Sequence, residues 1–453
     1  MRRILLVVCI TAAFTGCTVG PNYKRPAVPA PPQFRAGEPQ PGSASLGDTK
    51  WFDLFQDEKL RGLIKDALQA NYDVRIAAQR VIEAQNQLTA TRSALFPQVN
   101  AQVAVARTGL KSPIESTAGA GGVASWEIDL FGKLRRASEA ARADLLSVQE
   151  NQNAVMQTLV AQVASAYFDL LEYDAELQYV LESIDTRQTS VKLVTAREEG
   201  GVGDLLDVDQ AKTLVQSAQA QAALLQKAQE QTENLINFLL AKPPGAVERG
   251  RSLVEQPQPP QVPAGIPSAL LERRPDLRSA EQQLIAANAN VGVAKAAFFP
   301  SINLTGSGGV QTSDLLGVVG RGGAAYTMGG LVDLPIFDAG RRSANYKIAK
   351  AQREELLIAY QKAINGAFQD VSDALVGYQK NKEYTASQAL LADTLRHQTR
   401  YANMRYVGGV SSYLEVLDTE RQRLTAEQDL AQAQRDVLIS LVQLYKVLGG
   451  GWQ

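Results

Sequence analysis

Few residues in this 453-residue chain could do chemistry, and their spacing argues against an enzyme. The sequence has one histidine, His397, in a tract of helical composition, and two cysteines, of which Cys9 lies in an apolar N-terminal run. It has no glycine-rich phosphate loop and no spacing typical of a metal site. Carboxylates are plentiful, but they recur at the spacing of helix surfaces. We therefore expect no catalytic residue and no metal.

One acid–base pair follows a Gly-Gly turn near the end of the chain. Asp418 comes four residues after Leu414, and Arg421 comes three residues after Asp418, so all three would share one helix face. On its own, this spacing is typical of a solvated surface pair.

Three further acids, Glu127, Asp129 and Asp333, lie in segments where apolar and polar residues alternate. Four such segments occur, at about residues 98–108, 119–131, 301–312 and 324–337. Their length and alternation suit tilted membrane strands around a wet interior, although soluble hairpins packed on helices would look the same. If the three acids face inward, they would give a barrel lumen an acidic lining and a mild preference for cations.

The first residues of the chain read as a targeting segment. A basic start is followed by a short apolar run, Ile4 to Phe14, which is too short to span a membrane. We interpret residues 1–16 as a signal peptide. The small residues before Cys17 resemble a bacterial lipoprotein cleavage site, so Cys17 would carry a covalent lipid; an ordinary signal peptide is the alternative. Thr18 in the next position favours the outer membrane, and the mature chain could form no internal disulfide.

The remaining chain divides into a strap and two copies of one unit. Residues 17–50 and 243–267 are rich in proline and predict an extended N-terminal strap and a linker. Residues 51–242 and 268–453 are related by offsets of 203 residues (276 − 73, from Asp73 and Asp276) and of 208 residues (408 − 200, from the Gly-Gly turns). Phe96-Pro97 and Phe299-Pro300, also at an offset of 203 (299 − 96), mark a change from helical to strand pattern in each copy.

The lengths of the elements indicate an assembly. Each copy predicts a first helix, at about 58–95 and 268–298, then two strands and a proline-free helical tract, 133–199 and 339–407. A 67-residue helix would reach about 100 Å. The tract lengths and the lipoprotein signal favour membrane strands, but four strands cannot close a barrel. Several chains must therefore share one barrel. The sequence does not decide whether two or three chains do so. The balanced charge, 46 basic against 47 acidic residues, makes nucleic acid an unexpected partner.

Several stretches, spread over nearly the whole mature chain, carry a family resemblance. They are "TVGPNYKRP", "WFDLFQDEKL", "WEIDLFGKLRRA", "LLERRPDLRSAEQQLIAANANVGVAKAAFFPSI", "VDLPIFDAGRR" and "YKVLGGGW". The chain resembles the outer-membrane factor (TolC-like) family, in its NodT-type branch of efflux lipoproteins. The resemblance implies a mixed α+β membrane protein, in which a homotrimer forms one 12-stranded outer-membrane β-barrel continuous with a long periplasmic α-helical barrel.

The resemblance also implies a function and partners. The protein would be the exit duct of a tripartite efflux system in a Gram-negative bacterium, lipid-anchored in the outer membrane and extending into the periplasm. It would passively conduct small molecules such as drugs, working with a periplasmic adaptor (membrane fusion) protein and an inner-membrane resistance-nodulation-division transporter. No cofactor is expected beyond the lipid on Cys17.

Residue roles follow from the same resemblance. Tyr406, Leu414, Asp418 and Arg421 would form the periplasmic gate, with a ring of three Asp418 side chains around the pore. The first copy has Gln210 and Thr213 where the second has Asp418 and Arg421. The turns at the helix tips would contact the adaptor; they consist of Gly200, Gly201, Val202, Gly408, Gly409 and Val410.

Two other functions fit parts of the pattern. A duct for type I protein secretion would share the architecture, although the lipoprotein start and the "RRPDLR" motif favour small-molecule efflux. A structural lipoprotein spanning the periplasm would use the helices and the lipid, but it would not need four amphipathic strands. Copper or silver export is disfavoured because the four methionines do not cluster.

Overall fold

We analysed a computed structural model of the chain, which describes residues 18–27, 29, 31, 34, 45–108, 115–257, 269–313 and 323–452. The chain divides into two compact units. Unit 1 comprises Met1–Val28, Gln79–Glu150 and Arg278–Ala363, and unit 2 comprises Pro29–Ala78, Asn151–Leu277 and Ile364–Gln453.

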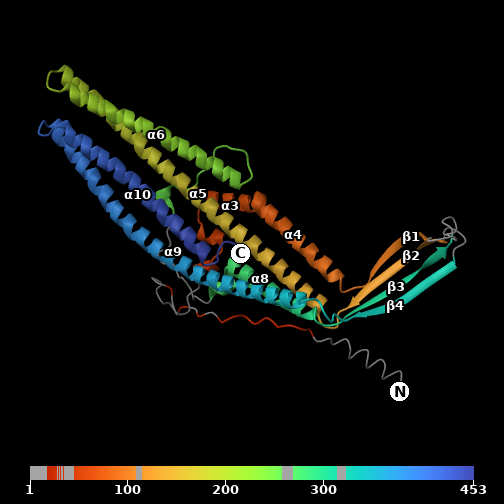
Figure 1. Ribbon diagram of the computed structural model, residues 1–453. Coiled ribbons are helices and arrows are strands. Elements are labelled where there is room, and N and C mark those ends of the chain that lie inside the picture. Colours follow the sequence, from red (N-terminus) through yellow and green to blue (C-terminus); the bar gives the residue numbers. More distant parts are fainter. Residues whose placement is uncertain are drawn as a thin grey trace. The chain divides into compact units, whose positions relative to one another are not determined.

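Unit 1 contains an antiparallel sheet of four strands. The strands are β1 (Gln98–Thr108), β2 (Glu115–Ile128), β3 (Ser301–Thr312) and β4 (Gly323–Asp333), side by side in the order β1-β2-β3-β4 (Figure 1). β1 and β3 start directly after Pro97 and Pro300, as the change of pattern predicts. The two hairpins are joined by antiparallel pairing of β2 with β3, from Ala118 opposite Thr312 to Ile128 opposite Ile302. Within the described residues, β1 and β4 each pair on one side only, so the sheet has two open edges.

The helical part of the chain is built from two long hairpins. α5 (Lys133–Glu199) and α9 (Arg341–Val407) each have 67 residues, and α6 (Leu205–Leu239) and α10 (Tyr413–Val447) each have 35. α5 and α9 occupy the two proline-free tracts that predicted long helices. Asp204 caps α6, since its carboxylate accepts a hydrogen bond from the Leu206 amide at 3.0 Å.

The first helix of each copy is broken, which the sequence pattern did not predict. Instead of one helix over 58–95, the chain forms α3 (Glu58–Ala70) and α4 (Tyr72–Ser93). Asn71 lies between them because its side chain accepts a hydrogen bond from the Asp73 amide at 2.8 Å and donates one to the Leu239 carbonyl at 2.8 Å. In the second copy, α7 (Leu270–Arg273) and α8 (Pro275–Ala296) are separated at Arg274, which is extended because a proline follows it.

The strand ends also differ from the predicted ones. β4 ends at Asp333 and not at 337, because Pro335 has no amide hydrogen to continue the ladder. β2 begins at Glu115 rather than at 119 and ends at Ile128 rather than at 131. Asp129 therefore lies beyond the strand that was expected to contain it.

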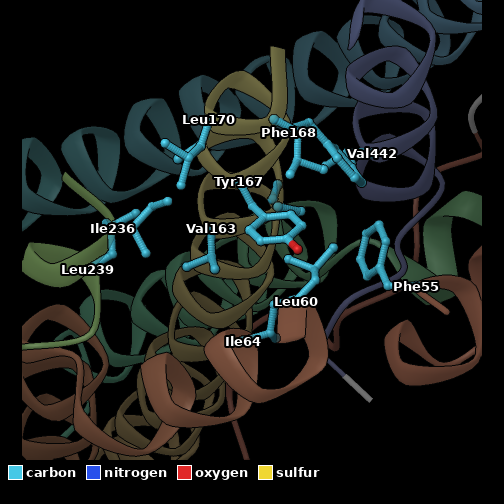
Figure 2. Packing of buried hydrophobic residues seen from close by; sticks show 14 of the residues in the cluster. Phe55, Leu60, Ile64, Val163, Tyr167, Phe168, Leu170, Ile236, Leu239 and Val442 are labelled. Carbon is cyan, nitrogen blue, oxygen red and sulfur yellow. The ribbon is translucent and has the colours of Figure 1, made fainter. Parts of the chain in front are cut away.

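The largest apolar cluster lies in unit 2. Phe55, the α3 residues Leu60 and Ile64, and α5, α6 and α10 side chains pack around Tyr167 (Figure 2). Among the described residues, α5 is the one helix long and apolar enough to cross a membrane, and 61% of its most apolar stretch is buried in the fold. Because Val163, Tyr167 and their neighbours fill this cluster, the apolar stretch of α5 is explained by core packing.

The first described residues lie along unit 1 in an extended conformation. The Val19 amide donates a hydrogen bond to the Phe131 carbonyl at 3.0 Å, just after the end of β2. Farther along, Tyr23 and Arg25 both bind the Glu281 carboxylate of α8, at 3.1 and 2.8 Å. The short helices η1 (Leu46–Asp48) and α2 (Trp51–Leu54) lead into α3, and η2 (Leu253–Glu255) lies in the linker.

Candidate functional site

The two Gly-Gly turns have the same backbone geometry. Between α5 and α6, the Val202 amide donates to the Arg197 carbonyl at 2.9 Å, and Gly201 has φ 74°. Between α9 and α10, the Val410 amide donates to the Arg405 carbonyl at 3.0 Å, and Gly409 has φ 73°. These bonds close each helix with a Schellman motif, which requires the left-handed conformation that glycine tolerates.

Each turn presents an apolar side chain to solvent. Val202 and Val410 are both largely exposed in the single chain. Because valine has few side-chain rotamers, an exposed valine can pack against a partner with little loss of conformational freedom. All six predicted tip residues lie in these two turns.

Three of the four predicted gate residues share one exposed face of α10. Leu414, in the first turn, is 63% exposed. Arg421 donates a hydrogen bond to the Asp418 carboxylate at 3.2 Å, and their side chains are 73% and 49% exposed. Gln422 donates to the other Asp418 oxygen at 2.6 Å. Because these three side chains are exposed in the single chain, this face is available for contacts outside the chain.

The fourth predicted gate residue, Tyr406, lies in a different environment. It is buried in an apolar cluster of α5, α6, α9 and α10 residues next to the turns. Its ring centre is 5.1 Å from that of Tyr413, and the Arg197 guanidinium lies over the ring at 4.9 Å. Burial raises the pKa of Tyr406. Tyr406 thus connects α9 to α5, but it does not share the exposed face of Asp418 and Arg421.

The three predicted lumen acids line one cavity of about 470 Å³ at the junction of strands and helices in unit 1. Basic residues accompany them there. The Lys133 ammonium binds Glu127 at 2.9 Å. Asp129 accepts hydrogen bonds from the Arg135 amide at 2.9 Å and from its guanidinium at 3.2 Å. Two of the three acids in this cavity therefore have a basic partner, which the sequence prediction of an acidic lining did not include.

Residues that complete the cluster near the turns were missed by the sequence reasoning. Tyr413 could have been found, since Tyr413, Val416 and Leu417 have the spacing of a buried helix face. Arg197 carries no local signal, because its partner Tyr406 belongs to the other copy. The buried pair of Arg187 and Glu420 also joins the two copies, so neither residue carries a local signal.

The predicted lipidation site, Cys17, lies outside the described residues. The chain that follows it is held at the junction of β2 and α5, where the Arg136 guanidinium donates to the Asn22 side chain at 2.6 Å. The Asn288 amide of α8 donates to the Pro21 carbonyl at 2.9 Å. These bonds hold the start of the strap against the first turn of α5 and against α8.

Comparison with known proteins gives a family match over most of the chain. The family described as "Outer membrane efflux protein" matches residues 63–242 and 266–450. The chain is 36% identical over 461 residues to the cation efflux system protein CusC of Escherichia coli O6:H1, covering 99% of both chains. It is also 36% identical over 451 residues to the solvent efflux pump outer membrane protein SrpC of Pseudomonas putida, covering 96% of both.

Solved structures give the same result for the fold. The outer-membrane channel OprN matches with a TM-score of 0.90 and 29% identity, over 96% of this chain and 100% of that one. The open state of the Neisseria gonorrhoeae MtrE outer membrane channel matches with a TM-score of 0.88 and 32% identity, over 96% and 99% of the two chains.

Proposed function

Because the chain belongs to the outer membrane efflux protein family, we propose that it is the outer-membrane channel of a tripartite efflux system. It passively conducts small molecules across the periplasm and the outer membrane of a Gram-negative bacterium. The observation that carries this function is the TM-score of 0.90 with an outer-membrane channel over 96% of the chain. Equal identity to a cation-efflux and a solvent-efflux protein means that overall identity does not select the cargo.

The channel acts as a homotrimer with a shared barrel. A sheet with open edges cannot lie in hydrocarbon, where every backbone amide and carbonyl needs a partner. The β1–β4 sheet has two such edges, and Tyr326 and Met328 of β4 are each 84% exposed in the single chain. Three copies joined edge to edge give about twelve strands, within the range of membrane barrels. The internal twofold repeat supplies two strand hairpins per chain. The equal lengths of α5 and α9, and of α6 and α10, support this repeat.

The long helices form the periplasmic duct, and the exposed face of α10 closes it. Around a threefold axis, three copies of Asp418 form a ring of negative charge, and three copies of Leu414 form an apolar constriction. Arg421 holds this face through its bond to Asp418. Tyr406 contributes from inside each chain, because its contacts with Arg197 and Tyr413 fix the start of α10, which we call the gate helix.

The membrane anchor is a lipid on Cys17. The position of the strap supports this, since the Val19 amide donates a hydrogen bond to the Phe131 carbonyl just after the end of β2. An acyl chain attached two residues earlier would meet the bilayer where the strands leave it. Glu127, Asp129 and Asp333 line the inner mouth of the barrel in this arrangement.

The partners follow from the tripartite system. The glycine turns, with exposed Val202 and Val410, contact the helical hairpins of a periplasmic adaptor, and the adaptor connects the duct to an inner-membrane resistance-nodulation-division transporter. The relatives named as efflux pump outer membrane proteins support this assignment.

Two measurements test the proposal. Native mass spectrometry of the detergent-solubilised protein should give three chains per particle; a dimer would contradict the twelve-stranded barrel. Expression together with a matching adaptor and transporter should restore dye export in a host that lacks its own outer-membrane channel. Absence of export by correctly assembled trimers would contradict the efflux function.

A further inference from the structure

An incompletely bonded ion pair lies buried between α5 and α10. The side chains of Arg187 (α5) and Glu420 (α10) are 5% and 2% exposed, and the Arg187 Nε lies 3.9 Å from a Glu420 carboxylate oxygen. This separation exceeds that of a hydrogen bond. Arg187 donates one hydrogen bond, to the Leu214 carbonyl of α6 at 2.9 Å. By distance and angle, its Nε and both Glu420 oxygens have no hydrogen-bond partner within the described part of the chain, although the Asn403 side chain lies close enough to Glu420 to lower its pKa.

A second buried glutamate on the same helix shows what a satisfied pair looks like. Glu427 accepts hydrogen bonds from Arg396 of α9 at 2.7 Å and from Arg423 at 2.8 Å. Glu427 and Glu420 are similarly buried, so burial alone does not leave a carboxylate without partners here. Of these two buried glutamates, Glu427 is fully paired and Glu420 is not.

The pair lies directly behind the gate. Glu420 is two residues after Asp418 and one before Arg421, but it points into the chain while those two are exposed. The corresponding pair of positions, 208 residues away in the other copy, is Leu395 and Lys212. Leu395 packs in an apolar cluster and the Lys212 side chain is 53% exposed, so no buried ion pair is repeated there.

Such a pair weakens the packing in which it is found. Each charge loses its hydration, and at 3.9 Å without a hydrogen bond the attraction does not compensate for that loss. Replacement of a buried ion pair by apolar residues of similar volume is often neutral or stabilising. The packing of α10 on α5 is therefore less stable than an apolar contact would make it.

We propose that the Arg187–Glu420 pair keeps the closed position of the gate helix marginally stable, so that α10 can leave α5 when the duct opens. The inference rests on the proposed function, because it requires a duct with a gate on α10. Arg187 and Glu420 act as positioning residues: they set how firmly the face with Leu414 and Asp418 is held, and they do not touch the conducted molecule.

The test compares open probabilities in planar bilayers. Single openings must be frequent enough to give an open probability. Every variant is therefore made in the Asp418→Ala, Arg421→Ala background, which should open more often. Adding Arg187→Met with Glu420→Leu should reduce the open probability about tenfold, because the apolar contact stabilises the closed packing. The matched control is Lys212→Met with Asp209→Leu, which removes an exposed ion pair of 3.7 Å on α6 and should leave the open probability unchanged.

The pH dependence supplies a second readout. Burial raises the pKa of Glu420, while Arg187, Arg423 and the Asn403 amide oppose this; the Tyr413 phenol also faces Glu420. If Glu420 is hydrated in the open duct, its pKa there returns toward the ordinary 4.5. The closed state then binds the proton more tightly, so its stability increases as the pH falls from the raised pKa toward 4.5.

The open probability should therefore decrease on acidification, and a Glu420→Gln variant should lose part of this response. Burial raises the pKa of Glu176 to about 7, so this residue also titrates in the same range. Only the part of the pH response that is lost in Glu420→Gln is therefore assigned to Glu420. An unchanged or raised open probability in the apolar double variant, or an identical pH response in Glu420→Gln, would overturn the inference. Failure of the background variant itself to conduct would instead contradict the proposed function.

Discussion

Asp57 should contribute more to stability than an ordinary helix cap. Its carboxylate accepts hydrogen bonds from the Lys59 and Leu60 amides, as a cap of α3 does, at 2.9 and 3.2 Å. It also accepts bonds from the Tyr167 hydroxyl at 3.0 Å, the Arg251 amide at 2.9 Å and the Gln256 side chain at 2.9 Å. One buried carboxylate thereby joins the first helix, the core of α5 and the proline-rich linker.

The magnitude follows from the donors that Asp57→Ala would leave without an acceptor. Loss of a helix cap costs about 0.5–2 kcal/mol. Each buried donor left without an acceptor costs about 1–3 kcal/mol, and the Tyr167 and Gln256 donors are buried with Asp57. We expect Asp57→Ala to lower the free energy of unfolding by about 4 kcal/mol. Asp57→Asn keeps one acceptor oxygen and should lose roughly half as much.

The assay is urea unfolding of the detergent-solubilised protein, followed by circular dichroism. Burial would raise the pKa of Asp57, but hydrogen bonds from Gln256, Arg251, Leu60 and Tyr167 outweigh it and hold the pKa below 3.8. The stabilisation should therefore persist at pH 3.8 and be lost as the pH falls through the lowered value. A loss below about 1 kcal/mol in Asp57→Ala would refute this reasoning, because it would mean that the donors find other acceptors.

Three further predictions concern the tips, the strap and the barrel mouth. Gly201→Ala or Gly409→Ala should each lower the free energy of unfolding by about 1 kcal/mol, measured by thermal denaturation, because φ is positive at both residues. The control Gly245→Ala, at an open position, should not lower it, and equal effects in all three variants would contradict the turn geometry. Glu281→Ala should release Tyr23 and Arg25 and speed tryptic cleavage of the strap, and unchanged cleavage would show that the Glu281 bonds do not hold it. Lys133→Ala with Arg135→Ala should shift the reversal potential in a salt gradient toward cation preference by freeing Glu127 and Asp129, and a shift toward anions would contradict the proposed lumen.

Features set by local sequence were predictable. The Phe-Pro pairs predicted where helix gives way to strand, because proline ends the helical bonding, and β1 and β3 start there. The absence of proline predicted the 67-residue helices. The first helix was predicted to begin at about residue 58, and the preceding residue, Asp57, accepts two capping hydrogen bonds there. The family was predicted from its motifs, and the match over both copies confirms it.

Features set by distant partners were not predictable. The break at Asn71 depends on the Leu239 carbonyl, and the burial of Tyr406 depends on Arg197 and Tyr413. The spacing of Leu414, Asp418 and Arg421 correctly placed these residues on one face, whereas Tyr406 precedes the turn and belongs to another helix. The balance of charge around Glu127 and Asp129 was also missed, because Lys133 and Arg135 come from α5 and not from the strands.

Single-channel recording in a planar bilayer tests the central claim most directly. Wild-type protein should give small or rare current steps, because in the proposed trimer the face with Leu414 and Asp418 closes the duct. The Asp418→Ala, Arg421→Ala variant should give large, stable steps, with little change in thermal stability since the pair is exposed. Silence from both proteins, each assembled as a trimer, would contradict the account of this chain as a gated outer-membrane duct.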